Sequence, residues 1–258
     1  MDLVEAKGLS EDRHPWELAR AVFFNREILG AIGNRPARVL DIGCGDGWFA
    51  RQLIPRLAPS STVTGWDVEL TGERLAIFSA GLPPGMELTA AEPAGSFDLI
   101  VCLDVIEHVA DDLEFLTDLG RRFLRPGGRL LCSVPAWPVL FSRHDVALRH
   151  FRRYTPAMGV KVLTSAGWIV RRKGGLFHAL AVIRGLQIIR QGRARPLADP
   201  RSAPATDDAI GIACWNAPRP VTRILTGLIV AEGLISRTAA SLRVELPGLS
   251  WWALCERP

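Results

Sequence analysis

Cysteine is scarce in this sequence, and its five cysteines do not form pairs. They lie at positions 44, 102, 132, 214 and 255 of 258 residues, without the short spacings of a metal knuckle or a disulfide framework. Those at 102, 132 and 255 fall in apolar runs that are typical of strands. The simplest interpretation is a reduced, cytoplasmic protein, and we expect no metal site.

Long hydrophobic runs are also missing. The N-terminal segment is charged and lacks the apolar core of roughly 7–15 residues that marks a secretory signal. No unbroken apolar run reaches about 18 residues, so a membrane-spanning helix is not expected. With 48% hydrophobic and 22% charged residues, the composition is that of a folded globular protein.

Acidic residues are nearly absent from one stretch of the chain. Residues 143–195 contain twelve Arg or Lys and one acid, Asp145, a local charge of +11 in a chain whose net charge is +4. The rest of the chain therefore carries −7. This imbalance favours a region that meets a negatively charged partner, with an ordinary solvated basic face as the alternative.

Short apolar runs and helical patterns alternate over the first 135 residues. An amphipathic helix is expected over 15–32, with further helices over 48–57 and 111–124. Strands are expected at Arg38–Ile42, Thr62–Trp66, Glu87–Ala90, Leu99–Leu103 and Gly128–Val134. This alternation predicts βαβ units and a mostly parallel sheet that is covered on both faces.

The pattern changes after Val134. We expect a helix over 155–166, a strand over 168–172, helices over 176–191 and 221–242 around an exposed loop at 193–208, and a strand over 249–258. The prediction is one domain in four parts: a lid helix in 1–34, a ligand-binding core in 35–172, a helical cap insertion in 173–246 and a terminal strand in 247–258.

A glycine-rich turn follows the first expected strand. The string VLDIGCGDGWF places Asp41 at the strand end and glycines at 43, 45 and 47 on the turn, where backbone amides can approach a ligand closely. The dinucleotide-binding pattern would need glycine at 48, where this chain has Trp48. Asp67 ends the next strand, a position from which a carboxylate binds both ribose hydroxyls of a nucleoside.

With these residues the chain resembles class I S-adenosylmethionine-dependent methyltransferases. The motifs that carry the resemblance are DIGCGDG at 41–47, Asp67, FDLIVCLDVIEHV at 97–109 and LRPGGRLL at 124–131. Further segments are similar to a broad, mostly uncharacterised bacterial branch of this family. The resemblance implies an α/β fold with a seven-stranded, mostly parallel Rossmann-like sheet in the order 3-2-1-4-5-7-6, its last strand antiparallel.

The same resemblance implies where S-adenosylmethionine binds. Asp41 and the glycine turn would hold its methionine end, Asp67 its ribose, and the end of the fourth strand would pass beside the methionine. The expected cofactor residues are Asp41, Gly43, Cys44, Gly45, Gly47, Asp67, Val68, Leu103 and Asp104. Relatives usually have an acid near the end of the third strand for the adenine amino group. Ala90 and Ala91 stand there, which leaves Glu92 or a backbone carbonyl.

Methyl transfer from a sulfonium needs positioning, exclusion of water and, for a hydroxyl acceptor, a base. The stretch after the fifth strand contains His144, Asp145 and His150. Either histidine, with an ordinary pKa of about 6.5, suits proton transfer at neutral pH, and Asp145 would orient the ring. The alternative is that these residues only close the domain. Glu107 and His108, after the fourth strand, more often fasten a turn in this fold.

The acceptor is expected to be a small, anionic and partly apolar molecule. Guanidinium groups in the stretch after the fifth strand suit a carboxylate or phosphate, and nearby aromatic rings are candidate walls. The expected acceptor-binding residues are Trp137, Phe141, Arg149, Arg152, Arg153 and Tyr154. Packing of Tyr154, the single tyrosine, under the sheet is the alternative for that residue, and core packing is the alternative for Trp137 and Phe141.

The predicted function is S-adenosylmethionine-dependent methyl transfer to this acceptor, at oxygen, with S-adenosylhomocysteine as the product. The alternative is a module that binds the cofactor without transferring its methyl group and acts at a membrane surface or on a partner. Nucleic acid is not expected, because no Asn-Pro-Pro-Tyr or Asp-Pro-Pro-Tyr motif follows the fourth strand. We expect weak association with an anionic membrane surface, unless the apolar helix faces pack on the sheet, and no obligate protein partner.

Overall fold

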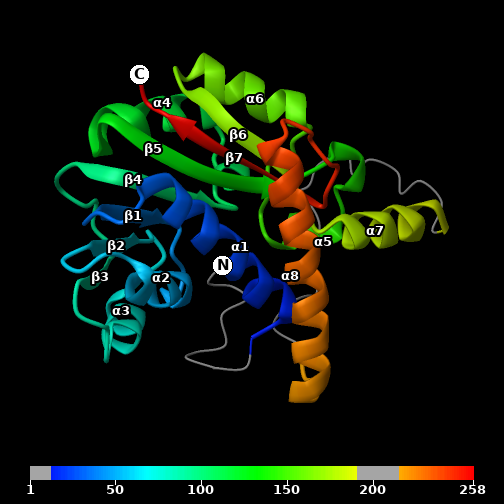
Figure 1. Ribbon diagram of the computed structural model, residues 1–258, viewed down its shortest axis with the longest axis horizontal. Helices are drawn as coiled ribbons and strands as arrows, with labels where there is room; N and C mark the ends of the chain where they lie inside the picture. The colour runs from blue at the N-terminus through cyan, green and yellow to red at the C-terminus, as the bar shows by residue number, and fades with distance from the viewer. Residues whose placement is uncertain (1–12, 191–214) are drawn as a thin grey trace.

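A seven-stranded sheet forms the centre of the protein in a computed structural model that describes residues 13–190 and 215–258 (Figure 1). The strand order is 3-2-1-4-5-7-6, and β7 runs antiparallel to both β5 and β6 while the other pairs are parallel. The expected fold is therefore confirmed. The strands are β1 Arg38–Ile42, β2 Thr62–Trp66, β3 Met86–Thr89, β4 Phe97–Leu103, β5 Leu124–Pro135, β6 Ile169–Leu176 and β7 Ser250–Glu256.

Helices cover both faces of this sheet (Figure 1). They are α1 Pro15–Ile32, α2 Trp48–Leu53, α3 Gly72–Ser79, α4 Asp112–Phe123, α5 Arg143–Ala147, α6 Pro156–Ser165, α7 His178–Arg190 and α8 Arg219–Ser241. Successive strand residues point to opposite faces, so Val39 joins a core with α1, whereas Leu40 joins a second core with α4 and α6. The sheet is thereby buried on both sides.

The lid helix α1 begins and ends where the sequence indicates. His14 caps its N-terminus through a ring nitrogen that accepts from Trp16, and Glu17 completes a capping box. Pro15 occupies the first turn, where its missing N–H costs nothing. Gly33 ends the helix with a φ of 69°, a conformation that glycine adopts without strain.

The expected start of the helical cap, residue 173, is wrong. β6 extends to Leu176, and α7 begins at His178. Two glycines at 174 and 175 suggest the end of a strand, but here they allow close packing. A Cβ at Gly175 would lie 2.3 Å from the carbonyl oxygen of Leu246, so only glycine lets β6 pass that backbone. The expected loop at 193–208 and Cys214 lie outside the described residues.

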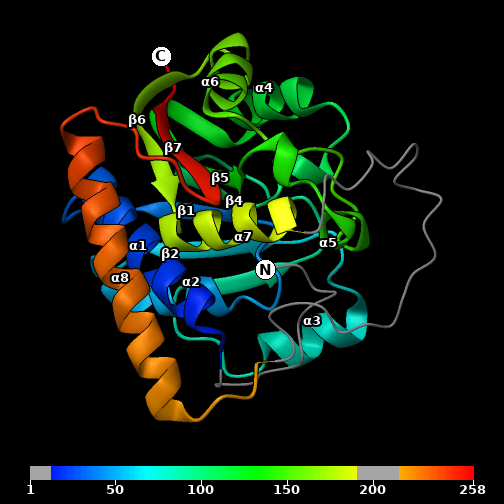
Figure 2. The ribbon, with the colours of Figure 1, turned by 90° about the vertical axis from the view of Figure 1, so that its right-hand side faces the viewer.

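Among residues 13–190 and 215–258, α8 is long and apolar enough to cross a membrane by length and composition. Its best 18-residue window has a mean hydropathy of 1.3. The helix itself was expected from the sequence, but its length and apolar character were not recognised as sufficient to span a membrane, because polar residues interrupt its apolar runs. α8 packs along α1, where Gly233 lies against Phe23, and leaves Ile224, Leu228 and Ile235 exposed (Figures 1 and 2).

Candidate functional site

The predicted site residues gather at the edge where the parallel strands end. Figure 2 looks onto this edge, with α7 crossing in front of it between α8 and α5. Open parallel sheets bind ligands beyond the carboxyl ends of their strands. The fold therefore brings together the glycine turn after β1, Asp67 after β2 and Asp104 after β4.

The glycine turn adopts a backbone that only glycines allow easily. Gly43, Gly45 and Gly47 have φ values of 66°, 58° and 73°. A Cβ at Gly43 would lie 2.6 Å from the side chain of Val105. The Asp67 carboxylate accepts a hydrogen bond from the Gly45 backbone N–H at 2.9 Å, which ties the turn to the end of β2.

Asp41 lies beneath this turn with part of its carboxyl unsatisfied. It is 4% exposed, and its Oδ2 has no hydrogen-bond partner in the described structure. Burial raises the pKa of Asp41 to about 7, and the nearby Asp67 charge adds to this rise. S-adenosylmethionine carries a cationic amino group and a sulfonium, and a buried carboxyl lacking a donor fits the cationic end of that molecule.

Arg13, two residues before α1, and Arg20 of α1 reach over the same edge, and the sequence analysis missed them. Arg13 forms an ion pair with Asp46 of the glycine turn, and Arg20 pairs with Asp104 at 2.7 Å. No local signal joins the two, because Arg13 precedes the helix cap and Arg20 lies in the second turn of α1. A hollow between α1 and the turn is lined by Arg13, Glu17, Arg20, Ala21, Cys44, Asp46, Trp48 and Phe49.

The other expected cofactor residues differ in their surroundings. Leu103 and Cys44 are buried, whereas Val68 is 75% exposed. Asp104 has a φ of 57° and accepts from the Ser133 hydroxyl at 3.0 Å. Glu92 forms an exposed ion pair with Arg122 of α4. The adenine contact of Glu92 stays a prediction.

Asp145 lies at the centre of a complete hydrogen-bond network. Its carboxylate accepts from the backbone and hydroxyl of Ser142, from Nδ1 of His150 at 3.0 Å and from Nε of Arg153 at 2.7 Å. Burial alone would raise the pKa of Asp145, but the bonds from His150 and Arg153 outweigh it and hold the pKa well below its ordinary value. Asp145 thus holds the ring of His150 through Nδ1 and also completes the capping box of α5.

His144 and His150 lie in different surroundings. His144, on α5, is half-buried, and this burial lowers its pKa. His150 packs edge-on against His108, with ring centroids 4.6 Å apart. The backbone N–H of Phe151 donates to the carbonyl of Glu107, which joins the loop after α5 to the 3₁₀ turn Ile106–His108 after β4.

The carboxyl group of Glu107 is fully buried, and neither oxygen has a hydrogen-bond partner in the described structure. Burial raises the pKa of Glu107 well above its ordinary value, and the neighbouring charge of Asp104 raises it further. The carbonyl of Glu107 fastens the turn, but its carboxyl does not. The role expected for this residue therefore accounts for its backbone only.

Acids pair with several residues of the basic stretch, and these acids lie elsewhere in the chain except for Asp145. Arg152 pairs with Asp112 at 2.9 Å, and Arg153 with Asp145. The pairs Arg171–Glu256, Arg172–Glu27 and Lys173–Glu245 continue this pattern. Arg149 is exposed at the end of α5. Of the three arginines expected to bind the acceptor, two are thus engaged within the protein.

The aromatic residues expected beside the acceptor make firm contacts of their own. The Tyr154 hydroxyl donates to Asp112 at 2.7 Å, and the side chain is 1% exposed, as in the packing alternative. Trp137 is half-buried and donates from Nε1 to the carbonyl of Gly248 at 2.8 Å. Phe141 is also half-buried.

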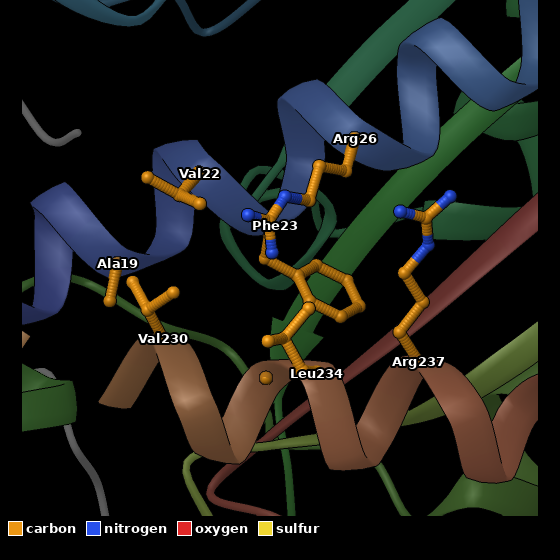
Figure 3. A pocket seen from close by; sticks show the side chains of 8 residues that line it. Ala19, Val22, Phe23, Arg26, Val230, Leu234 and Arg237 are labelled. Atoms are coloured by element: carbon orange, nitrogen blue, oxygen red, sulfur yellow. The ribbon is translucent and has the colours of Figure 1, made fainter. Parts of the chain in front are cut away.

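A second groove lies between α1 and α8 (Figure 3). Val22 and Phe23 of α1 face Val230 and Leu234 of α8 across it. Arg237 lines the groove as well, and its Nε pairs with the buried Glu27 at 2.8 Å. None of the expected cofactor residues lines this groove, so it is separate from the glycine turn.

Comparison with known proteins identifies similar sequences over most of the sheet. Residues 16–169 match a family model described as "Methyltransferase domain". A ubiquinone biosynthesis O-methyltransferase of Dinoroseobacter shibae is 37% identical over 182 residues, which cover 62% of this chain and 72% of that protein. Another, from Cereibacter sphaeroides, is 33% identical over 53% of this chain and 57% of that protein. The chain thus spans little more than half the length of the latter, and 52% of a Xanthomonas axonopodis relative.

A solved structure of similar fold is the S-adenosylmethionine-dependent methyltransferase from Mesorhizobium loti. It is 17% identical, covers 91% of this chain and 96% of its own, and superposes with a TM-score of 0.54. The comparisons confirm the class that the sequence resembles and its Rossmann-like sheet. They lend no support to a module that binds the cofactor without transferring its methyl group.

Proposed function

Because the chain belongs to the methyltransferase domain family, we propose that it transfers a methyl group from S-adenosylmethionine to an oxygen of a small acceptor. The observation that carries the proposal is the buried Asp41 carboxyl, whose unpartnered oxygen lies beneath the glycine turn and close to Asp67. The O-methyltransferase relatives support oxygen as the methylated atom.

S-adenosylmethionine, when bound, supplies a methyl group on a positively charged sulfur. Asp41 and Asp67 would hold its cationic and ribose parts, and Arg20 fixes Asp104 beside it. Asp145 holds His150 through Nδ1, which leaves Nε2 with the lone pair that takes a proton or binds a cation. His144 is the other candidate base for the acceptor hydroxyl.

We infer a partly apolar acceptor of the kind that the name of the relatives suggests, a hydroxylated precursor of a quinone. The helix α7, which crosses the site edge, exposes Val182, Ile183 and Leu186. Arg149 is an exposed guanidinium near this edge, so an acidic group on the acceptor would bind there. The exposed faces of α7 and α8 support weak contact with an anionic membrane on the cytoplasmic side.

The experiment is a methyl-transfer assay with purified protein and a panel of ring compounds. The panel pairs each phenol with its O-methyl ether, with and without a prenyl tail, and S-adenosylhomocysteine formation is measured. We expect turnover of the phenols and none of the ethers, with preference for the prenylated phenols. Failure to bind S-adenosylmethionine in calorimetry would overturn the proposal. Turnover of amines but not phenols would overturn its assignment to oxygen.

A further inference from the structure

The groove between α1 and α8 is apolar at one end and basic at the other. Figure 3 shows Ala19 and Val230 at the apolar end, whereas Arg26 and Arg237 lie toward the other end. The groove has an empty volume of about 190 Å³. Sites for drug-sized ligands are larger, about 300–1,000 Å³. The groove therefore suits a narrow molecule that lies along it.

The basic end of the groove carries more positive charge than the protein balances there. Glu27, buried on α1, pairs with Arg172 at 2.7 Å and with Arg237 at 2.8 Å, so one acid serves two guanidinium groups. Within the part of the chain that the structure describes, the neighbouring Arg26 forms no hydrogen bond or ion pair. Three arginines and one glutamate leave a local charge of +2. An anion in the groove would balance this charge.

The guanidinium group of Arg237 is accessible to such an anion. Its Nε bonds to Glu27, but its Nη2 would lie 3.5 Å from a Cβ at Gly30, so the missing side chain leaves that nitrogen uncovered. Gly30 follows Arg26 by one helical turn, which places both on one face of α1. Figure 3 shows both arginine side chains reaching into the space between the helices. Neighbouring guanidinium groups suit a carboxylate or a phosphate.

The apolar part of the groove suits a hydrocarbon chain. Val22 and Val230 are half-buried, and Leu234 on the groove wall is 45% exposed. Gly233 also lines the groove and has no side chain to fill it. A hydrocarbon chain laid between the helices would remove these apolar surfaces from water, which favours binding.

We propose that this groove binds a free single-chain anionic amphiphile. Its carboxylate or phosphate head would lie between Arg26 and Arg237, and its chain would lie along Val22 and Leu234. The small volume has room for one chain and not for the paired chains of a bilayer lipid. Because none of the expected cofactor residues lines the groove, the proposal goes beyond methyl transfer and does not depend on it.

The test is calorimetric titration of the whole chain with decanoate and with decyl phosphate. We expect one equivalent of each to bind, and the relative affinities show which head group is preferred. Decanol lacks the charge and acetate lacks the chain, so each should bind at least tenfold more weakly than decanoate.

Variants test the two halves of the groove separately. Arg26→Gln removes the unpaired charge and should weaken decanoate binding at least tenfold. The matched control is Arg74→Gln, at an exposed arginine of α3 far from α8, and it should leave binding unchanged (Figures 1 and 2). Leu234→Asn removes the apolar wall, so it should weaken binding of decanoate but not of acetate.

Folding of each variant is checked by circular dichroism and by its melting temperature without ligand. Decanoate should raise the melting temperature of the wild type and of Arg74→Gln, but not of Arg26→Gln. The proposal is overturned if the wild type binds neither anion, or if folded Arg26→Gln and Leu234→Asn bind decanoate as tightly as the wild type.

Sedimentation with phosphatidylglycerol vesicles separates a free amphiphile from a bilayer lipid. Protein that sediments with the vesicles but binds neither anion in solution would show that the occupant is a bilayer lipid, which also overturns the proposal. These measurements need neither S-adenosylmethionine nor a methyl acceptor, so their outcome is independent of the proposed methyl transfer.

Discussion

Two side-chain carboxyl groups near the edge where the parallel strands end are equally buried but differ in their hydrogen bonding. Asp145 and Glu107 are both fully buried. Asp145 accepts hydrogen bonds from Ser142, His150 and Arg153, whereas the carboxyl of Glu107 accepts none within the described structure. Their pKa values accordingly move in opposite directions. Burial alone therefore does not set the charge state of a carboxyl: bonds from His150 and Arg153 favour the ionised form of Asp145, whereas burial without such bonds favours the protonated form of Glu107.

The strongest test of this contrast is removal of Asp145. Asp145→Ala leaves the buried guanidinium of Arg153 without its charge partner, and loss of one member of a buried pair costs about 3–5 kcal/mol. We expect that loss in the free energy of unfolding, measured with urea. A loss below about 1 kcal/mol would mean that the network does not hold the loop after α5.

Asp67 is an intermediate case, half-buried and bonded to two backbone N–H groups. If it holds the ribose, Asp67→Ala should weaken S-adenosylhomocysteine binding by about 1.5–3 kcal/mol, the range for a hydrogen bond to a charged group. Calorimetry measures this loss, and Glu69→Ala, an exposed acid two residues further on, is the matched control. Equal affinities of the two variants would contradict the assignment.

The opposite pKa directions predict opposite slopes of stability against pH. Glu107 keeps its proton in the folded state at pH values where the unfolded chain has released it, so its contribution falls as pH rises above the ordinary value. Asp145 contributes stability above its ordinary pKa, and this is lost as pH falls through the depressed value. Glu107→Gln should remove the fall in the free energy of unfolding with rising pH that Glu107 causes, about 1.4 kcal/mol per pH unit.

Urea unfolding of wild type and Glu107→Gln between pH 5 and about 8 measures this difference. The two curves should diverge as pH rises, because only the wild type has a carboxyl to ionise. Parallel curves would show that the carboxyl already has a partner, and the contrast with Asp145 would then fail.

The smallest effect is expected at an exposed pair. Arg122 and Glu92 are each about half exposed, and solvent screens their attraction. Arg122→Ala should therefore change the free energy of unfolding by less than about 1 kcal/mol. A loss as large as that of Asp145→Ala would mean that ion pairing, and not burial, sets these energies.

The parts that could be predicted from sequence are those written in consecutive residues. The turn at 41–47 follows a strand and precedes a helix, so its position was predictable, and the order of the sheet followed from the family resemblance that this turn and the other motifs carry. The exact length of β6 was not predictable, because Gly175 is needed only where the backbone of residues 246–248 packs against that strand. Local signals indicate a glycine but not what approaches it.

The candidate site beyond the glycine turn depends on contacts between distant segments. Arg20 meets Asp104, and His150 meets His108, only once α1 and the loop after α5 are folded onto the sheet. The charge of 143–195 predicted a negative partner, but much of it is matched by acids such as Glu27 and Asp112 elsewhere in the chain.

The placement of β7 has a consequence for synthesis on the ribosome. This strand follows all the others in the chain, yet it lies between β5 and β6, with Trp251 and Trp252 buried. Until it is translated, the nascent chain has two strands whose inner edges lack a neighbour, and such edges invite pairing with other chains. Premature termination before residue 250 would thus yield a product with its sheet open in the middle, prone to aggregation.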